Sequence, residues 1–167
     1  MGPFSTTLVA PGVTVNFIQD EPGLGPLSRP ALAAIEETCM DEALRETTKR
    51  TARMLFHTLK EGVGFEDWKK IDKDLARELS MFFTGKLYSR EVISQKQREL
   101  CAVASLTVLN REREVHAHIH AALNVGATRQ EVAEVIFQQV TYGGMPVVVE
   151  ALEVLKQVLE ERGEWEA

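Results

Sequence analysis

The residues best placed to do chemistry lie in one short run, residues 111–118, which reads Arg-Glu-Arg-Glu-Val-His-Ala-His. In a helix, Arg111, Glu114 and His118 stand at i, i+3 and i+7 and therefore share one flank. There Arg111 could hold a carboxylate substrate, Glu114 could orient the imidazole, and His118 could serve as general acid or base without a cofactor. The alternative is an ordinary Glu–His pair beside a surface arginine, which contributes roughly a few tenths of a kcal/mol.

A fourth candidate, Glu99, lies on the preceding predicted helix. A helical wheel places His118 about 60° from Val115, at the border of the apolar face. Glu99 has a similar border position, about 100° from the inner-facing Leu100. A short connection at Asn110 would pack the two helices together, so Glu99 could approach His118. The alternative interpretation of Glu99 is an ordinary carboxylate on a helix flank.

Two more histidines, His116 and His120, fall on the opposite side of the same wheel. Their i,i+4 spacing occurs in many zinc sites, but a zinc site needs further ligands. The chain offers no HExxH motif and no cysteine pair to supply them. We therefore expect no metal site, and we interpret both histidines as solvated or as part of an interface.

Three residues in predicted connections could contact a substrate. Tyr88 and Arg90 lie between Gly85 and Ser94, and Tyr142 precedes a Gly-Gly turn. Loop residues of these types often contact ligands. Packed tyrosines and a solvated arginine are the alternative.

The composition excludes several classes of protein. The 167 residues suffice for one domain with its own core, and 44% are apolar and 26% charged. With 25 acidic and 19 basic side chains the formal net charge is −6, and no Lys/Arg cluster stands out. Nucleic acid and anionic membranes are therefore disfavoured as partners. We expect neither a secretory signal nor a membrane span, since no apolar run reaches about 18 residues.

The two cysteines, Cys39 and Cys101, are far apart and show no CxxC or metal-ligand spacing. A structural disulfide framework is not expected, and a reducing, cytoplasmic compartment fits. The chain also has no glycine-rich phosphate loop and no Ser/His/Asp hydrolase signature.

Two regions of different composition divide the chain. Residues 1–30 hold five of the six prolines, and we expect an irregular N-terminal arm there. Residues 13–17 alternate apolar and polar, which favours a short strand, but nothing nearby offers a partner. The arm is either a floppy terminus or a segment that lies on a neighbouring subunit. Residues 31–167 are expected to form a single all-α domain.

The second region predicts about six helices with short connections, as in a helix bundle. Capping-box patterns open two of them, at Ser94 and at Thr128, and Pro146 suits a first turn. The predicted helices cover about residues 31–60, 65–83, 94–109, 111–125, 128–141 and 146–163. One apolar stripe at helical spacing is expected to be plain core: Trp68, Ile71, Leu75, Leu79 and Phe82.

Several of these segments together resemble the carboxymuconolactone decarboxylase family, within the alkylhydroperoxidase D-like superfamily. The resemblance covers about residues 65–160 and rests on the order and spacing of several motifs. They are residues 83–90 (FTGKLYSR), 97–100 (QREL), 110–118 (NREREVHAH), 121–128 (AALNVGAT), 131–134 (EVAE), Gln139 and 142–146 (YGGMP).

The resemblance implies an all-α bundle that forms trimers or hexamers, with active sites near subunit contacts. One branch of the family removes CO₂ from γ-carboxymuconolactone in aromatic catabolism, without a metal or organic cofactor. The peroxidase branch uses a Glu, a CxxC pair and a His as a thiol relay. Aligned with that branch, this chain keeps Glu99 and His118 but has Arg111 and Glu114 in place of the two cysteines. The decarboxylase branch therefore fits better.

We thus expect a cofactor-free carboxy-lyase that binds a small anionic substrate, a carboxylated lactone or related keto acid. The expected catalytic residues are His118, Glu114 and Glu99, and the expected substrate contacts are Arg111, Tyr88, Arg90 and Tyr142. Two alternatives remain. One is a thiol-dependent peroxidase that uses Cys101 with an external thiol. The other is a non-catalytic oligomeric scaffold, in which side chains fill the cleft around His118.

Overall fold

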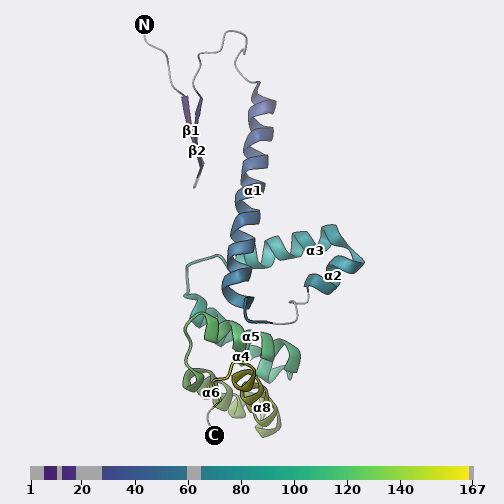
Figure 1. The fold of residues 1–167 in the computed structure, drawn as a ribbon, viewed down its shortest axis with the longest axis vertical. Coiled ribbons are helices and arrows are strands. Elements are labelled where there is room, and N and C mark those ends of the chain that lie inside the picture. The colour runs from purple at the N-terminus through teal and green to yellow at the C-terminus, as the bar shows by residue number, and fades with distance from the viewer. Residues whose placement is uncertain (1–5, 11–12, 18–27, 60–64, 166–167) are drawn as a thin grey trace. The chain divides into compact units, whose positions relative to one another are not determined.

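The computed structural model describes residues 6–10, 13–17, 28–59 and 65–165. Most of the described chain is helical, as Figure 1 shows, and the expected all-α class is confirmed. The chain divides into two compact units, residues 1–44 and 45–167. The division falls inside the long helix α1 (Arg29–Phe56) and not at the end of the proline-rich region. The proposed domain boundary near residue 30 therefore stays a prediction.

The first unit contains a β-hairpin. Strand β1 (Thr6–Ala10) pairs antiparallel with β2 (Val13–Phe17), in a register that places Thr6 opposite Phe17 and Ala10 opposite Val13. The structure differs here from the irregular arm that we expected, because the strand at residues 13–17 does have a partner. Only two residues separate the strands, the shortest common hairpin connection. The first part of α1, up to Leu44, also belongs to this unit.

The second unit is built from the end of α1 and a series of shorter helices. These are α2 (Phe65–Ile71), α3 (Lys73–Ser80), η1 (Met81–Leu87), α4 (Gln95–Val108), α5 (Glu112–Asn124), α6 (Arg129–Gln138), α7 (Val140–Gly143) and α8 (Met145–Glu161). Helices α4, α5, α6 and α8 enclose the main core, with α5 packed against both α4 and α8.

The main core consists of aliphatic side chains at helical spacing. Val115 and Ile119 of α5 are buried against Val103 of α4 and Val158 of α8. This pattern of one apolar stripe per helix is what a bundle core requires. The two capping boxes predicted at Ser94 and Thr128 are both present and fix the starts of α4 and α6. Pro146 lies in the first turn of α8, as predicted.

The predicted helix over residues 65–83 is split into two α-helices and a π-helical segment. The side chain of Asp72 accepts hydrogen bonds from the backbone N–H groups of Asp74 and Leu75, at 3.0 and 2.9 Å, and so caps a new helix. The π-helical segment η1 runs through Gly85, which we expected to end the helix. π-Helical turns are rare and occur frequently at functional sites.

The apolar stripe on α2, α3 and η1 is not core in the single chain, so that prediction is wrong. All five side chains are exposed: Trp68 48%, Ile71 88%, Leu75 52%, Leu79 37% and Phe82 58%. It is the small Ala76 that α3 buries instead. The periodicity correctly indicated an amphipathic face, but nothing in the described part of the chain covers it.

No helix among the described residues is both long enough and apolar enough to cross a bilayer. This agrees with the absence of a long apolar run in the sequence.

Candidate active site

A buried carboxylate and a histidine meet between α4 and α5. Nδ1 of His118 lies 2.7 Å from Oε2 of Glu99. The Glu99 side chain is wholly buried, whereas the His118 side chain is 15% exposed. A carboxylate only accepts hydrogen bonds, so with Glu99 ionised Nδ1–H of His118 donates to it. Nε2 then keeps its lone pair, which is the arrangement of a histidine oriented for acid–base work.

Local sequence explains why these two residues meet. Asn110 adopts φ 51°, a left-handed conformation that asparagine tolerates, and it closes the short turn between α4 and α5. The two helices therefore pack directly, and the flank carrying Glu99 faces the flank carrying His118. The contact between them follows the expectation from the wheel.

Glu99 has one oxygen without a hydrogen bond. Oε1 is buried and has no partner among the residues that the structure describes. An unpaired buried acceptor costs about 1–3 kcal/mol, and more when it is charged. A buried polar atom without a partner calls for an explanation, and a catalytic role is one of the usual ones.

The end of α1 forms one wall of this site. The ring of Phe56 meets the imidazole of His118 edge-on, with centroids 6.1 Å apart. The backbone oxygen of Leu55 accepts a hydrogen bond of 2.8 Å from Nδ2 of Asn124, which ties α1 to α5. Leu55 is fully buried beside Tyr88 and Ala121, in a small cluster separate from the main core. Sequence analysis did not single out this wall, because α1 is far from the motif in sequence.

Tyr88 lies in the same small cluster, next to the Glu99–His118 pair. Its ring stacks at a tilt on Phe83, with centroids 4.5 Å apart, and the guanidinium of Arg98 sits 5.4 Å from its centroid. Burial, reinforced by the negative charge of Glu99, raises the pKa of Tyr88 to about 12, against an opposing effect of Arg98. The phenol is thus neutral at any ordinary pH, so it can donate a hydrogen bond but does not act as a base.

Glu114 does not take the place expected for it. It is exposed, and among the described residues the His118 ring makes its hydrogen bond to Glu99 and not to Glu114. Arg111 is the N-terminal flanking residue of α5 and is also exposed. It lines a space of about 10 Å³ together with Val115 and Glu150, and that volume suits about one water molecule. The space that Arg111 lines among the described residues is therefore too small for a substrate.

The two remaining expected contacts, Arg90 and Tyr142, are both exposed. The backbone oxygen of Arg90 accepts a hydrogen bond from Arg98, whose guanidinium lies on Tyr88. Tyr142 belongs to the short helix α7 and is 70% exposed. No contact to His118 is seen for either side chain within the described residues.

Of the other two histidines, His120 is buried, so the solvated alternative is wrong for that residue. Only 2% of His120 is exposed, and His116 is half-buried. Both rings bond to Glu161 at the end of α8. Sequence analysis missed Glu161 because it lies about forty positions away and on another helix.

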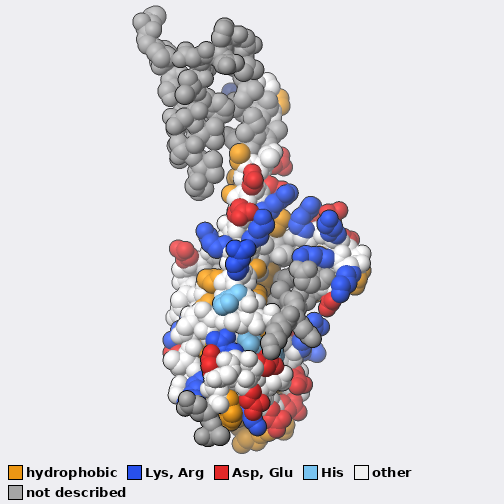
Figure 2. All heavy atoms as spheres, in the orientation of Figure 1, with side chains coloured by type: hydrophobic (Ala, Val, Ile, Leu, Met, Phe, Trp, Pro, Cys, Tyr) orange, Lys and Arg blue, Asp and Glu red, His pale blue; other side chains and the backbone are white. Residues whose placement is uncertain are grey.

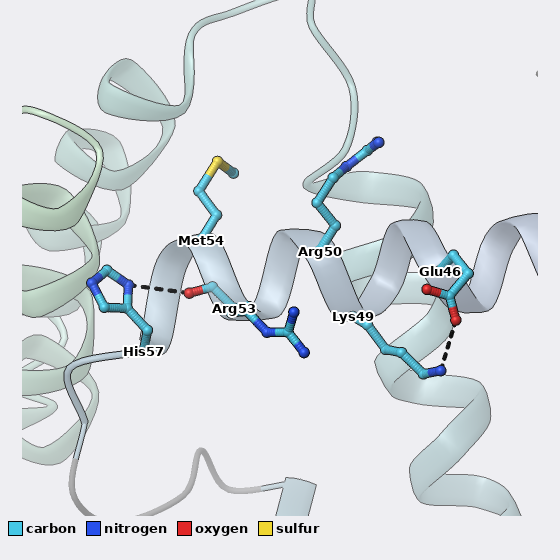
Figure 3. A pocket seen from close by; sticks show the side chains of 6 residues that line it. All are labelled: Glu46, Lys49, Arg50, Arg53, Met54 and His57. Carbon is cyan, nitrogen blue, oxygen red and sulfur yellow. Dashed lines mark hydrogen bonds and ion pairs between the residues drawn. The ribbon is translucent and has the colours of Figure 1, made fainter.

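A separate hollow among the described residues lies away from this pair. It has a volume of about 570 Å³ and runs along one face of α1. Figure 3 shows its lining, where Lys49 and Glu46 form an ion pair and His57 bonds to the backbone oxygen of Arg53. None of the expected site residues line it, and a single helix face cannot enclose a ligand. We therefore place the candidate site at Glu99 and His118 on the strength of their chemistry, not of cavity size.

The fold and the buried Glu–His pair define a class, an all-α bundle in which a carboxylate and a histidine meet between two packed helices. Residues 74–157, half of the chain, match the carboxymuconolactone decarboxylase family. The chain belongs to this family. Glu99, Arg111, Glu114 and His118 all fall within the matched segment.

Two relatives extend this result. The chain is 38% identical over 88 residues to the "Uncharacterized 15.0 kDa protein in nqo9-nqo10 intergenic region" of Paracoccus denitrificans, which covers 52% of this chain and 65% of that protein. It is 30% identical over 100 residues to a 4-carboxymuconolactone decarboxylase of Acinetobacter baylyi, covering 60% of this chain and 75% of that enzyme. The chain thus spans somewhat less than two thirds of the first of these relatives.

Proposed function

We propose that the protein is a cofactor-free carboxy-lyase acting on a carboxylated lactone or a related keto acid. The observation that carries the proposal is the 2.7 Å contact between His118 and the buried Glu99. Family membership and the similarity to a 4-carboxymuconolactone decarboxylase support the choice of reaction.

The reaction needs charge stabilisation and one proton transfer. The bond between the substrate carbon and its carboxylate breaks, CO₂ leaves, and the electron pair passes into the neighbouring carbonyl as an enolate. A proton must then reach carbon. In the proposed mechanism Nε2 of His118 first takes a proton from water and then gives it to that carbon, while Glu99 stabilises the imidazolium through Nδ1 and orients the ring.

Four further residues would bind the substrate. Tyr88, held neutral, would donate its phenolic proton toward the developing negative charge. Arg111 would bind a carboxylate, and Arg90 and Tyr142 would contact the substrate less directly. Glu114 would act only through its negative charge in the first turn of α5, since the His118 ring makes its hydrogen bond to Glu99 instead.

We further propose a homo-oligomer, a trimer or hexamer, as the functional state. Two observations support this. The exposed stripe on α2, α3 and η1 leaves large apolar side chains in water, and such patches mark interaction surfaces. Of the expected substrate contacts, Tyr88 lies near the Glu99–His118 pair, but Arg90, Arg111 and Tyr142 are exposed in the described part of the chain, so we expect a neighbouring subunit to complete the site. With two cysteines unpaired, Cys39 and Cys101, we propose a reducing, cytoplasmic location.

A screen of carboxylated lactones and β-keto acids for CO₂ release tests the activity. We expect turnover of at least one carboxylated lactone by the protein purified without added metal and treated with a chelator. Failure of every such substrate, with the oligomer intact, would rule out the carboxy-lyase.

The thiol peroxidase is the competing activity within the same family. It requires a reactive sulfur, and Cys101 is exposed on α4, two residues from Glu99. Peroxide consumption with an external dithiol should be at background level, and Cys101→Ser should not change CO₂ release. A peroxidase rate that Cys101→Ser abolishes would support the competing activity instead.

A further inference from the structure

We propose that His116, His120 and Glu161 form a site for one divalent transition-metal ion of the zinc type. The site joins α5 to α8 and is separate from the Glu99–His118 pair. It goes beyond the proposed function, which needs no metal.

The three side chains already converge. Nε2 of His116 lies 3.0 Å from Oε2 of Glu161, and Nε2 of His120 lies 3.2 Å from the same oxygen. The two imidazole centroids are 4.9 Å apart, and one ligand atom from each residue lies within 4.8 Å of the others. In tetrahedral coordination with bonds of about 2.1 Å, ligand atoms are separated by about 3.4 Å. The two distances to Glu161 are already close to this value, so the main adjustment is an approach of the two rings.

The donor set matches zinc chemistry. Two histidines one helical turn apart with a carboxylate from another element is a ligand set that binds Zn²⁺ and leaves a fourth position for water. Imidazole nitrogens favour Zn²⁺ and its transition-metal neighbours over Mg²⁺ or Ca²⁺, which take oxygen ligands. The Glu161 carboxylate brings a negative charge to the cluster, which would favour a cation.

A second layer of contacts holds the ligands in place. Nδ1 of His120 lies 3.1 Å from the hydroxyl of Thr58, and that hydroxyl also accepts a hydrogen bond of 2.9 Å from Asn124. A hydroxyl oxygen can accept from both, so Nδ1–H of His120 can donate to Thr58 and leave Nε2 for the ion. On the other side, Nε2 of Gln157 donates to Oε1 of Glu161 at 2.9 Å.

Protonation does not block the site. Burial lowers the pKa of His120, an effect that its bond to Glu161 only partly offsets. This shift favours the neutral ring, which is the form that binds a metal ion. Arg162 is the nearby positive charge that opposes a cation, and its guanidinium is already engaged by Glu164 at 2.9 Å and by Asn124 at 2.9 Å.

Without a metal the same groups could serve only as a hydrogen-bonded clamp between α5 and α8. The test is zinc titration by calorimetry of the full chain, without a histidine tag and stripped of metal. We expect one Zn²⁺ per chain and a rise of the melting temperature as zinc is added. Zinc affinity should fall at acid pH, because protons compete with the ion for the ligand atoms. Mg²⁺ should not compete.

The variants are His116→Ala and Glu161→Gln, which change half-buried and exposed groups and should leave the fold intact. Each should weaken zinc binding at least about tenfold, since loss of supporting residues around a metal alone costs that much. His57→Ala, which changes an exposed histidine directly after α1, is the matched control and should bind zinc as the wild type does. Cys101→Ser should also leave binding unchanged.

Absence of saturable zinc binding, or wild-type zinc affinity in both ligand variants, would contradict the proposed metal site. The three residues would then serve only as the hydrogen-bonded clamp between α5 and α8. His118→Asn should bind zinc normally, so a failure of this site and a failure of the proposed carboxy-lyase can be told apart.

Discussion

Nδ1 of His118 lies 2.7 Å from Oε2 of Glu99, whose side chain has no exposed surface. Both residues come from helix flanks that face each other across a short turn. Among the described residues, the side chain that holds the His118 ring through a hydrogen bond is therefore Glu99 and not Glu114.

Glu99→Gln should therefore lower kcat much more than Glu114→Gln. An amide at position 99 cannot stabilise an imidazolium, and we expect a loss of about 10²-fold or more, the usual range for a group in proton transfer. Glu114→Gln is the matched control and should change kcat by less than about threefold. Steady-state CO₂ release on the best substrate measures both. A large loss in Glu114→Gln with none in Glu99→Gln would reverse the assignment.

The exposed stripe should be a subunit contact. Ile71→Glu combined with Phe82→Glu places two charges in it and should convert the oligomer to smaller species, as measured by sedimentation or light scattering. Val92→Glu, which changes a side chain that is 79% exposed outside the stripe, should leave the oligomer unchanged. A wild-type protein that is monomeric at micromolar concentration would contradict the prediction.

Tyr88 should titrate far above an ordinary tyrosine. Its pKa is raised to about 12 in the folded chain, mainly by burial. Because the folded value exceeds the unfolded value of about 10, the contribution to stability is complete below pH ~10 and is lost between about pH 10 and 12. The difference in tyrosinate absorbance between the wild type and Tyr88→Phe gives the pKa. A midpoint near 10 would show that the ring is solvated.

Glu131 should contribute to stability on the acid side. Its hydrogen bond with Lys96 and its bond to the backbone of Thr128 lower its pKa to about 2. The folded value is depressed, so the contribution is complete above the unfolded pKa of about 4.5 and is lost as the pH falls toward 2. Unfolding of Glu131→Gln and the wild type should differ most at neutral pH and least near pH 2. A difference that does not depend on pH would contradict this.

The sequence predicted the positions of most helices and the meeting of Glu99 with His118. Apolar periodicity, two capping boxes and a short turn at Asn110 are local signals, and local signals suffice to place neighbouring helices side by side. The same logic paired Glu114 with His118 because they lie one turn apart on one helix. The wheel cannot show that the ring turns instead toward the neighbouring helix.

Other features depend on contacts between distant segments or between subunits, which patterns in a single sequence do not reveal. The periodicity of Trp68, Ile71 and Leu75 is the same for a core face and for a subunit face. Glu161 approaches His116 and His120 only because α8 packs on α5. The partner of the strand at residues 13–17 was missed because β1 lies within a region dominated by proline and glycine.

The most direct test of the proposed mechanism is the rate of CO₂ release by His118→Asn. Asparagine keeps a hydrogen-bond donor near the position of Nδ1, so Glu99 is not left unpaired, and it removes the nitrogen that would carry the proton. On a carboxylated lactone that the wild type turns over, His118→Asn should lose about 10²-fold or more in kcat with its oligomeric state unchanged, while His57→Ala keeps the wild-type rate. A wild-type rate in His118→Asn would contradict the central claim.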